Sequence, residues 1–560
     1  MIVILDQQFQ LILQRIVVNK IKDFIMRNID FIFVLIACFA IIEKSISCDF
    51  SNDTISRQGQ VDSFNIYYPG CTKIAGNMVI TGAITNLDSL YRIRQIAGTL
   101  SIINTQLKNC LGLYNLDTIY GFRCIYNAVL KNLYGLESLT YAGAIYIKNN
   151  VALEEIHSIS STDFTDFFLC ECPKILVILG FNTPILLSNI VIENNDGIIA
   201  IDAFNKVEEL TGNYKIALCS SLSTLSTGYK LKFLHGSLHI TALRKLVVFP
   251  SFENLILVKK HLTIQGLTTL TQWKAFNNLQ STFDLRIYFA RELEFYPDFP
   301  KLTLVKGDLD LGDNFKIRYM DGFNALDSVQ GSLRIFRSDS LISVNGFKNL
   351  RFIGSQFSVG NLRSLKEING FGQLNYVEYT VHFHSLWLVT ELNIFSNLNH
   401  IKKLYIWTNK YLNNISWLNN LNINKLEELQ IISNDSLSYC HYEAICKYLN
   451  ENKGKHDIRF NKKGCNNAEE ILEACRTVGV DDLKEKDLTI YPNPTSSHFY
   501  IESDAELEAD DIEIFTTTGS KVPFIRVGDA VYPHALEGGI MIVKIKISGQ
   551  TLVKKIIYLP

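Results

Sequence analysis

Three groups of side chains in this chain have a spacing that could support metal binding or redox chemistry. Cys170 and Cys172 are two residues apart, and so are His382 and His384, so each pair would share one face of an extended strand. Two such side chains can form a redox pair or supply part of a metal site. The third group is a cluster of four cysteines near the C-terminus, namely Cys440, Cys446, Cys465 and Cys475.

Structural roles are the favoured interpretation of all three groups. A lone Cys-x-Cys is more typical of a structural bridge or of packed thiols, and two histidines without a third ligand are more typical of a surface. The C-terminal cysteines lack the Cys-x-x-Cys spacing of zinc fingers, so we expect two disulfides among them and leave their pairing open. We also expect a disulfide between Cys48 and Cys71, which bracket a polar stretch. No metal ligand and no cofactor-binding residue is assigned.

Catalytic motifs are missing from the sequence. It contains no Gly-x-x-x-x-Gly-Lys-Ser/Thr, no His-Glu-x-x-His, no Gly-x-Ser-x-Gly and no calcium-loop pattern. Acidic residues such as Glu154, Glu209 and Asp310 are scattered, and we expect no two adjacent outward strand positions to be both acidic. We therefore assign no catalytic residue and expect that the protein is not an enzyme. The alternative is a carbohydrate-active β-helix enzyme, which would need two carboxylates about 5 to 9.5 Å apart.

The elements that position these side chains come from a repeat of 22 to 26 residues. Segments such as Gly98-Thr-Leu-Ser-Ile102 and Gly331-Ser-Leu-Arg-Ile335 each combine a glycine turn with a short alternating strand. Between strands the chain often has an Asn followed by Leu-x-x-Leu-x-Gly-Leu-x-x-Leu, with substitutions. The second apolar residue of each strand gives sixteen markers: Ile80, Ile102, Ile125, Ile147, Leu169, Ile192, Leu218, Ile240, Ile264, Ile287, Leu311, Ile335, Val359, Phe383, Ile406 and Ile431.

This repeat predicts a mainly β fold, a right-handed parallel β-solenoid of about 16 turns of 22–26 residues with disulfide caps. Two apolar residues per strand face one interior, and stacked strands bond in a parallel ladder. The connecting segments are too short for the crossover helices of a parallel α/β sheet. The pattern is weakest between residues 163 and 223, where we expect an irregular turn.

The remaining boundaries follow from composition. An apolar run at 31–42 indicates a signal peptide within residues 1–47, with Met26 as a possible true start. Its removal leaves 11 of the 12 cysteines, so at least one thiol stays free or pairs between molecules. We expect an N-terminal cap at 48–77, repeats at 78–437, a Cys-rich helical cap at 438–476, a linker at 477–487 and a small antiparallel β-sandwich at 488–560.

The last 70 or so residues contain an ordered set of short motifs, namely Tyr491-Pro492-Asn493-Pro494, the Thr-Gly-Ser turn at 518–520, the Gly-Gly-Ile-Met-Ile-Val strand at 538–543 and Lys554-Lys555. On these motifs the segment resembles the type A C-terminal sorting domain of the type IX secretion system of Bacteroidetes, in which Tyr491-Pro492-Asn493-Pro494 is the sorting motif. The repeats resemble leucine-rich repeats and, more closely, the receptor L-domain. These resemblances imply export to the outer-membrane surface, with the type IX secretion machinery as one partner.

The function that fits best is binding or adhesion to an extracellular protein or glycan, and a structural surface spacer is a further alternative. With 54 basic and 56 acidic residues the net charge is -2, so nucleic acid is not expected as a partner. We expect binding to use the outward residues between the apolar markers, although any exposed strand face is polar. This candidate face is His239, Thr263, Arg286, Asp310, Arg334, Ser358, His382 and Tyr405, with Tyr288, Arg337, His384 and Trp407 two or three residues further on.

Overall fold

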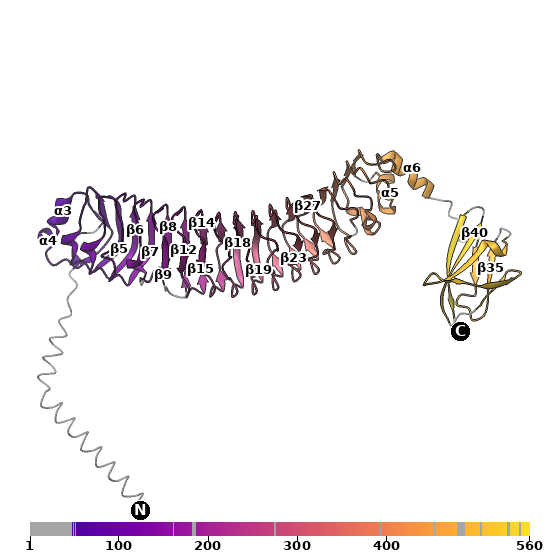
Figure 1. Ribbon diagram of the computed structural model, residues 1–560, viewed down its shortest axis with the longest axis horizontal. Helices are drawn as coiled ribbons and strands as arrows, with labels where there is room; N and C mark the ends of the chain where they lie inside the picture. The colour runs from indigo at the N-terminus through magenta and orange to yellow at the C-terminus, as the bar shows by residue number, and fades with distance from the viewer. Residues whose placement is uncertain are drawn as a thin grey trace, which may run out of the picture. The chain divides into compact units, whose positions relative to one another are not determined.

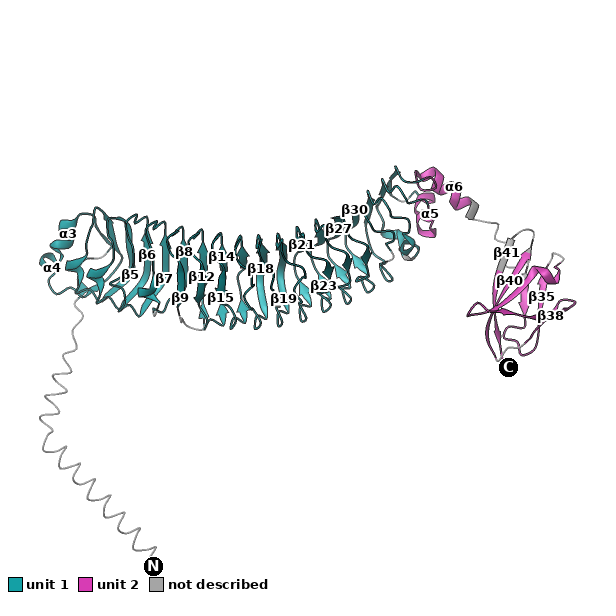
Figure 2. Ribbon diagram, in the orientation of Figure 1, with its two compact units in different colours: residues 1–438, 452–462 teal, residues 439–451, 463–560 magenta. Residues whose placement is uncertain are grey.

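The chain forms two compact units (Figure 2), which comprise residues 1–438 with 452–462 and residues 439–451 with 463–560. The computed structural model describes residues 47–48, 50, 52–160, 162–181, 186–273, 276–392, 394–452, 454–478, 488–503, 507–534, 538–547 and 550–559. The signal peptide expected within residues 1–47 and the linker expected at 477–487 lie outside these residues, except that Ser47 belongs to β1 and Thr477 and Val478 end α6. None of the described helices is long and apolar enough to span a bilayer.

Unit 1 is a parallel β-solenoid in which each turn adds a strand to a common ladder (Figure 1). The hydrogen-bonded strands lie in register, so equivalent residues of successive turns stack at about 4.8 Å. This main ladder contains β2 (Asp53–Ile55), β4 (Met78–Gly82), β5 (Gln95–Thr105), β6 (Thr118–Ile125), β7 (Tyr141–Lys148), β8 (Asp166–Cys170), β11 (Asn189–Glu193), β14 (Tyr214–Ala217), β17 (Leu238–Thr241), β18 (Leu257–Gln265), β19 (Ser281–Tyr288), β21 (Leu309–Gly312), β24 (Leu333–Phe336), β27 (Gln356–Leu362), β30 (Thr380–Leu386), β31 (Lys403–Trp407), β32 (Glu428–Ile432) and β33 (Lys455–Arg459).

Shorter strands form further parallel ladders on other sides of the solenoid. A second ladder is formed by two-residue strands, which are β1 (Ser47–Cys48), β3 (Lys73–Ile74), β10 (Leu186–Leu187), β13 (Glu209–Leu210), β16 (Phe233–Leu234), β20 (Leu304–Val305), β23 (Ser328–Val329), β26 (Phe352–Ile353) and β29 (Tyr376–Val377). The first residues of the long strands β5, β6, β7, β18 and β19 also belong to this ladder. Two separate three-stranded sheets are β9 (Val177–Gly180), β12 (Ala200–Ala203) and β15 (Thr224–Ser226), and β22 (Tyr319–Met320), β25 (Ser343–Val344) and β28 (Glu367–Ile368). The predicted parallel β-solenoid is therefore confirmed.

Fourteen of the sixteen apolar markers point into the core, and two were assigned wrongly. Cys124, not Ile125, aligns with Ile102 and is fully buried. Ile216, not Leu218, aligns with Ile192, because Leu218 lies in the left-handed turn after the strand and is 49% exposed. The irregular turn expected at 163–223 is also not found in the main ladder, where β8, β11 and β14 pair without a register shift.

Two internal stacks fill the solenoid next to the strands. Phe299, Phe323 and Phe347 lie with ring centroids 5.0 and 5.2 Å apart between neighbours, in nearly parallel planes, and the stack continues on both sides. The other stack consists of buried asparagines in the turns. Asn434 donates to the carbonyl of Ile406 at 2.9 Å, and its backbone N–H donates to Asn461 at 2.9 Å. Such bonds satisfy polar groups that burial would otherwise leave unpaired.

The N-terminal end of unit 1 carries a small cap. Helices α3 (Gln58–Asp62) and α4 (Phe64–Tyr67) bury Val61 and Phe64 against the first turn, which contains the 3-10 segment η1 (Asp88–Leu90). The expected disulfide between Cys48 and Cys71 is present. Other 3-10 segments in the turns are η2 (Leu111–Leu113), η3 (His157–Ile159), η4 (Ser416–Asn420) and η5 (Ile423–Lys425).

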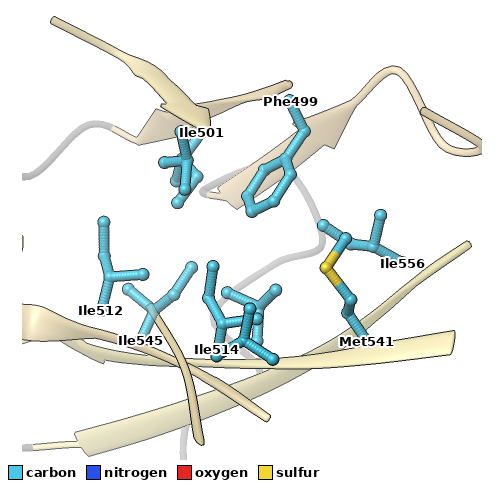
Figure 3. Close-up of a cluster of buried hydrophobic side chains, with 10 residues drawn as sticks. Phe499, Ile501, Ile512, Ile514, Met541, Ile545 and Ile556 are labelled. Carbon is cyan, nitrogen blue, oxygen red and sulfur yellow. The ribbon is translucent and has the colours of Figure 1, made fainter. Parts of the chain in front are cut away.

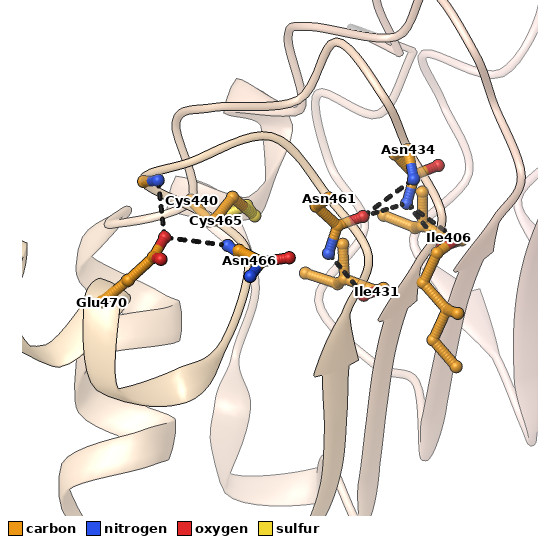
Figure 4. Close-up of a disulfide and its surroundings, with 10 residues drawn as sticks. Ile406, Ile431, Asn434, Cys440, Asn461, Cys465, Asn466 and Glu470 are labelled. Carbon is orange, nitrogen blue, oxygen red and sulfur yellow. Dashed lines mark hydrogen bonds between the residues drawn. A yellow bond between two sulfur atoms is a disulfide. The ribbon is translucent and has the colours of Figure 1, made fainter.

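Unit 2 begins with two helices joined by two disulfides. Cys446 in α5 (Glu443–Asn450) bonds to Cys475 in α6 (Ala468–Val478), and Cys440 bonds to Cys465 in the segments before the two helices. Glu470 accepts hydrogen bonds from the backbone N–H groups of Gly464 and Asn466 (Figure 4). The hydrogen bonds of Glu470 fix the start of α6, and the two disulfides give the cysteine pairing that the sequence left open.

The remainder of unit 2 is a sandwich of two antiparallel four-stranded sheets. One sheet contains β34 (Leu488–Tyr491), β35 (Phe499–Ser503), β39 (Ala530–Pro533) and β38 (Phe524–Val527). The other contains β37 (Lys521–Val522), β36 (Ile512–Thr516), β40 (Gly539–Ile547) and β41 (Gln550–Tyr558), and a 3-10 segment η6 (Ala509–Asp511) precedes β36. Phe499 and Ile501 from the first sheet meet Ile514 and Met541 from the second in one core (Figure 3). The small C-terminal β-sandwich is thus confirmed.

Candidate binding face

The outer face of the main ladder is built from side chains that alternate with the buried markers. The residues predicted for it, from His239 to Tyr405, are paired in register across eight consecutive strands from β17 to β31. We call this series the central column. Its members are His239, Thr263, Arg286, Asp310, Arg334, Ser358, His382 and Tyr405.

Two flanking columns share this face, because residues two positions away along a strand point to the same side. The column after the central one contains Tyr288, Phe336, His384 and Trp407, and the column before it contains His261, Asp284 and Asp308. The sequence interpretation missed Asp284, Asp308 and Phe336, although their spacing of two from a central residue could have revealed them. Arg337 lies off the columns, in the left-handed turn after β24, where it bonds to Asp313 at 2.7 and 2.8 Å.

A charged cluster occupies the middle of this face. Arg334 donates to Asp310 through Nε at 2.5 Å and through a terminal nitrogen at 2.9 Å, and it also bonds to Asp308 at 2.7 Å. Arg286 bonds to Asp284 at 2.8 Å. Asp310 is only 3% exposed, so its charge depends on these partners. The hydrogen bonds and charge of Asp310 raise the pKa of Arg334.

This cluster corrects the expectation that no two adjacent outward positions are acidic. Asp310 lies on β21, Asp308 immediately precedes this strand, and both accept hydrogen bonds from the guanidinium of Arg334. Asp308 belongs to the column before the central one, which the sequence interpretation did not include. His261 Nδ1 also lies 2.7 Å from Asp284. Every carboxylate of this cluster therefore has a cationic or imidazole partner.

An aromatic cluster lies further along the same face. The rings of Tyr405 and Trp407 stack with centroids 5.1 Å apart, and His382 lies 4.5 Å from both His384 and Trp407. All four side chains are half-buried. A Cβ at Gly360 would lie 2.1 Å from the imidazole of His384, so the absence of a side chain on β27 leaves the space that this ring fills.

The histidines of this cluster make the stability of unit 1 pH-dependent. Burial lowers the pKa of His382 from 6.5 to about 4, with a smaller contribution from the charge of His384. In the unfolded chain, His382 takes up a proton at its ordinary pKa of 6.5, whereas the folded protein keeps the imidazole neutral down to about pH 4. The contribution of His382 to the stability of unit 1 is therefore fully present above about pH 6.5 and is lost as the pH falls toward about 4. We expect the melting temperature to fall less between pH 7 and pH 4.5 in His382→Phe than in the wild type. An equal fall in both proteins would contradict this.

The cysteine pair considered for redox chemistry is buried and reduced. Cys170 and Cys172 are not bonded to each other, and burial raises their pKa values to about 11 and about 12. Cys110, Cys124 and Cys219 are likewise buried free thiols. High thiol pKa values disfavour the reactive thiolate, so these residues are packed as small apolar side chains. Within the described ranges no three His, Cys, Asp or Glu side chains gather into a metal-binding group.

Comparison with known families assigns both ends of the chain. Residues 70–175 match the model of the receptor L domain, and residues 489–558 match that of the secretion system C-terminal sorting domain. The chain is a secreted solenoid repeat protein with a type IX sorting domain. A comparison with curated proteins found no match. The sorting domain directs the protein to the cell surface.

The sorting motif has a clear structural role in this domain. Tyr491 pairs with Tyr500 at the end of β34, and Pro492 and Pro494 follow without backbone N–H groups that could extend the strand. Asn493 donates to the carbonyl of Lys555 at 2.9 Å and accepts from the N–H of Ile557 at 2.8 Å. The motif therefore ties the first strand of one sheet to the last strand of the other.

Proposed function

We propose that unit 1 binds an extracellular protein or glycan through the outer face of its main ladder and that it does so without catalysis. The observation that carries this proposal is the aromatic cluster of His382, His384, Tyr405 and Trp407, which is half-buried beside a charged cluster on one rigid sheet. Tyr, Trp and Arg are the residue types most often found at energetic hot spots of interfaces. A ladder held by backbone bonds on both sides pre-organises these side chains, so little conformational entropy is lost on binding.

The carboxylates favour binding over hydrolysis. A glycoside hydrolase needs one protonated acid and a second free carboxylate across the scissile bond. Asp310 and Asp308 instead accept hydrogen bonds from the same guanidinium, and Asp284 accepts from Arg286. Carboxylate oxygens that already accept hydrogen bonds from an arginine are not available as the free acid and the free nucleophile of a hydrolase.

The test is to screen the purified chain against glycans and extracellular proteins and to measure the best ligand with variants. We expect Tyr405→Ala with Trp407→Ala to weaken binding about tenfold or more, since hot-spot truncations cost about 2 kcal/mol or more. The matched control is Trp387→Ala with Tyr411→Ala, because these side chains are 50% and 45% exposed in the turns after β30 and β31 and lie outside the columns.

Circular dichroism and thermal melting establish that both variants fold. Undiminished binding by a folded Tyr405→Ala, Trp407→Ala protein would place recognition on another part of the chain. The absence of any ligand in the screen would favour the structural spacer.

A further inference from the structure

A second candidate site lies on another side of unit 1, beside β22, β25 and β28. A hollow of about 520 Å³ opens there across successive turns. Backbone hydrogen bonds from Arg318 to Glu294, from Ile342 to Arg318 and from Lys366 to Ile342 hold four of its residues in one column. The complete lining is Glu294, Lys316, Arg318, Ser340, Ile342, Ser364, Lys366 and Leu388. We call this hollow the lateral groove.

Two cations of the lateral groove lack the partner that several cations of the solenoid have. Arg334 and Lys402, for example, bond to acids one turn earlier in the ladder, Asp310 and Glu378. Lys316 follows this pattern with Glu292. Among the described residues, neither Arg318 nor Lys366 has an ion pair, and both side chains are exposed.

The spacing of these charges fits a chain-like anion better than a small ion. Arg318 and Lys366 are separated in the column by Ile342, so their backbones are about 10 Å apart, at about 4.8 Å per turn. Both side chains would have to bend toward each other to share one phosphate or sulfate. A polymer with repeated anionic groups can contact each cation separately.

The other lining residues suit a sugar chain. Ser340 and Ser364 provide hydroxyl groups next to the two cations, and their small side chains form the space of the groove. Ile342 and Leu388, the latter 41% exposed, offer aliphatic surface to the apolar face of a sugar ring. An added peptide strand does not fit, because β22 and β25 already pair with the turns on both sides.

We propose that the lateral groove binds an anionic glycan, with carboxylate or sulfate groups at Arg318 and Lys366 and sugar rings over Ile342 and Leu388. An adjoining hollow shares Lys366 and Leu388 but is lined by Glu367 and Glu391. These acids, and Glu294 one turn before Arg318, repel further anionic segments and limit binding to the stretch from Arg318 to Lys366.

The test is calorimetric titration of the full mature chain at low and physiological salt with three hexasaccharides. These are an oligogalacturonate, which carries carboxylates, a heparin fragment, which also carries sulfates, and neutral maltohexaose. We expect binding of one or both charged probes and none of maltohexaose. Binding of the oligogalacturonate identifies a carboxylate ligand, and binding of the heparin fragment alone identifies a sulfated one.

Variants separate this site from general electrostatic attraction. Arg318→Ala with Lys366→Ala should weaken binding of the charged probe at least tenfold, whereas Lys348→Ala with Lys410→Ala removes equal charge outside the groove and should change it less than twofold. Equal weakening by both pairs, absence of binding to either charged probe, or equally tight binding of a hexaglutamate peptide would overturn the proposal. Tyr405→Ala with Trp407→Ala should leave this binding unchanged, so failure here is distinct from failure of the main binding face.

Discussion

A chain that ends at residue 487 is expected to fold its repeats normally and to be absent from the cell surface. Among the described residues, the buried core of the sorting domain consists of side chains from Phe499 to Ile556, with Ile490 and Tyr558 packed against it, and all of these lie in the segment that the truncation removes. The sorting domain is the part of the chain that directs it to the surface. The expected result is complete loss of surface exposure, measured by protease accessibility of intact cells, with an unchanged thermal transition of the purified repeats.

Point variants give the matched comparison for this truncation. Val543→Asp places a charge in the sandwich core, where Val543 is fully buried, and should unfold the sorting domain and abolish display. Lys546→Ala changes an exposed side chain of the same strand and should be displayed normally. Normal surface display of the truncated chain would contradict the assignment of the sorting function to residues 488–560.

The course of the main ladder could be predicted from the sequence because its signal is strictly local. An inward residue every second position, after a glycine turn, recurs at nearly constant spacing. The two wrong markers show the limit of counting apolar residues. At one position the inward residue is the small Cys124, and the more apolar Ile125 beside it attracts the count. At the other position Leu218 is apolar but lies in an exposed turn.

The phenylalanine stack could not be predicted in this way. Phe323 and Phe347 both have φ of 65°, a left-handed conformation that bulky residues rarely adopt. Local rules therefore argue against Phe at these turns, whereas burial of the ring and its stacking on rings from neighbouring turns favour it there. The ion pairs of Arg334 could not be predicted from local sequence for a related reason. The paired residues are 24 or 26 residues apart in the sequence, and only the register of the ladder brings Asp308 and Asp310 to Arg334.

The charged cluster also leads to the second large expected effect. Arg334→Ala is expected to lower the free energy of unfolding of unit 1 by about 3 to 5 kcal/mol, the usual cost of removing one partner of a buried ion pair. The carboxylate of Asp310 is almost inaccessible to water and accepts two hydrogen bonds from Arg334. Without them its nearest cation is Arg286, at 3.6 Å. Denaturant unfolding of the purified chain measures the change.

Arg351→Ala is the matched control, because Arg351 and Asp327 also belong to successive turns but are 3.9 Å apart and have side chains 65% and 57% exposed. A pair of this kind contributes about 0 to 1 kcal/mol. Replacement of both buried partners, by Asp310→Val with Arg334→Val, should recover most of the lost stability, since two β-branched side chains remove the uncompensated charge and suit a strand.

The three measurements distinguish a buried ion pair from a surface contact. The single variants Asp310→Val and Arg334→Val complete a double-mutant cycle with the double variant. If Arg334 acts through Asp310, the effects of these two single variants will not add, and the cycle will give a coupling energy well above 1 kcal/mol. If Arg334→Ala costs no more than Arg351→Ala, the carboxylate of Asp310 is hydrated and the charged cluster does not hold the sheet together. In that case Arg334 would be free to contact a ligand directly, and its alanine variant would join Tyr405→Ala and Trp407→Ala as a test of binding.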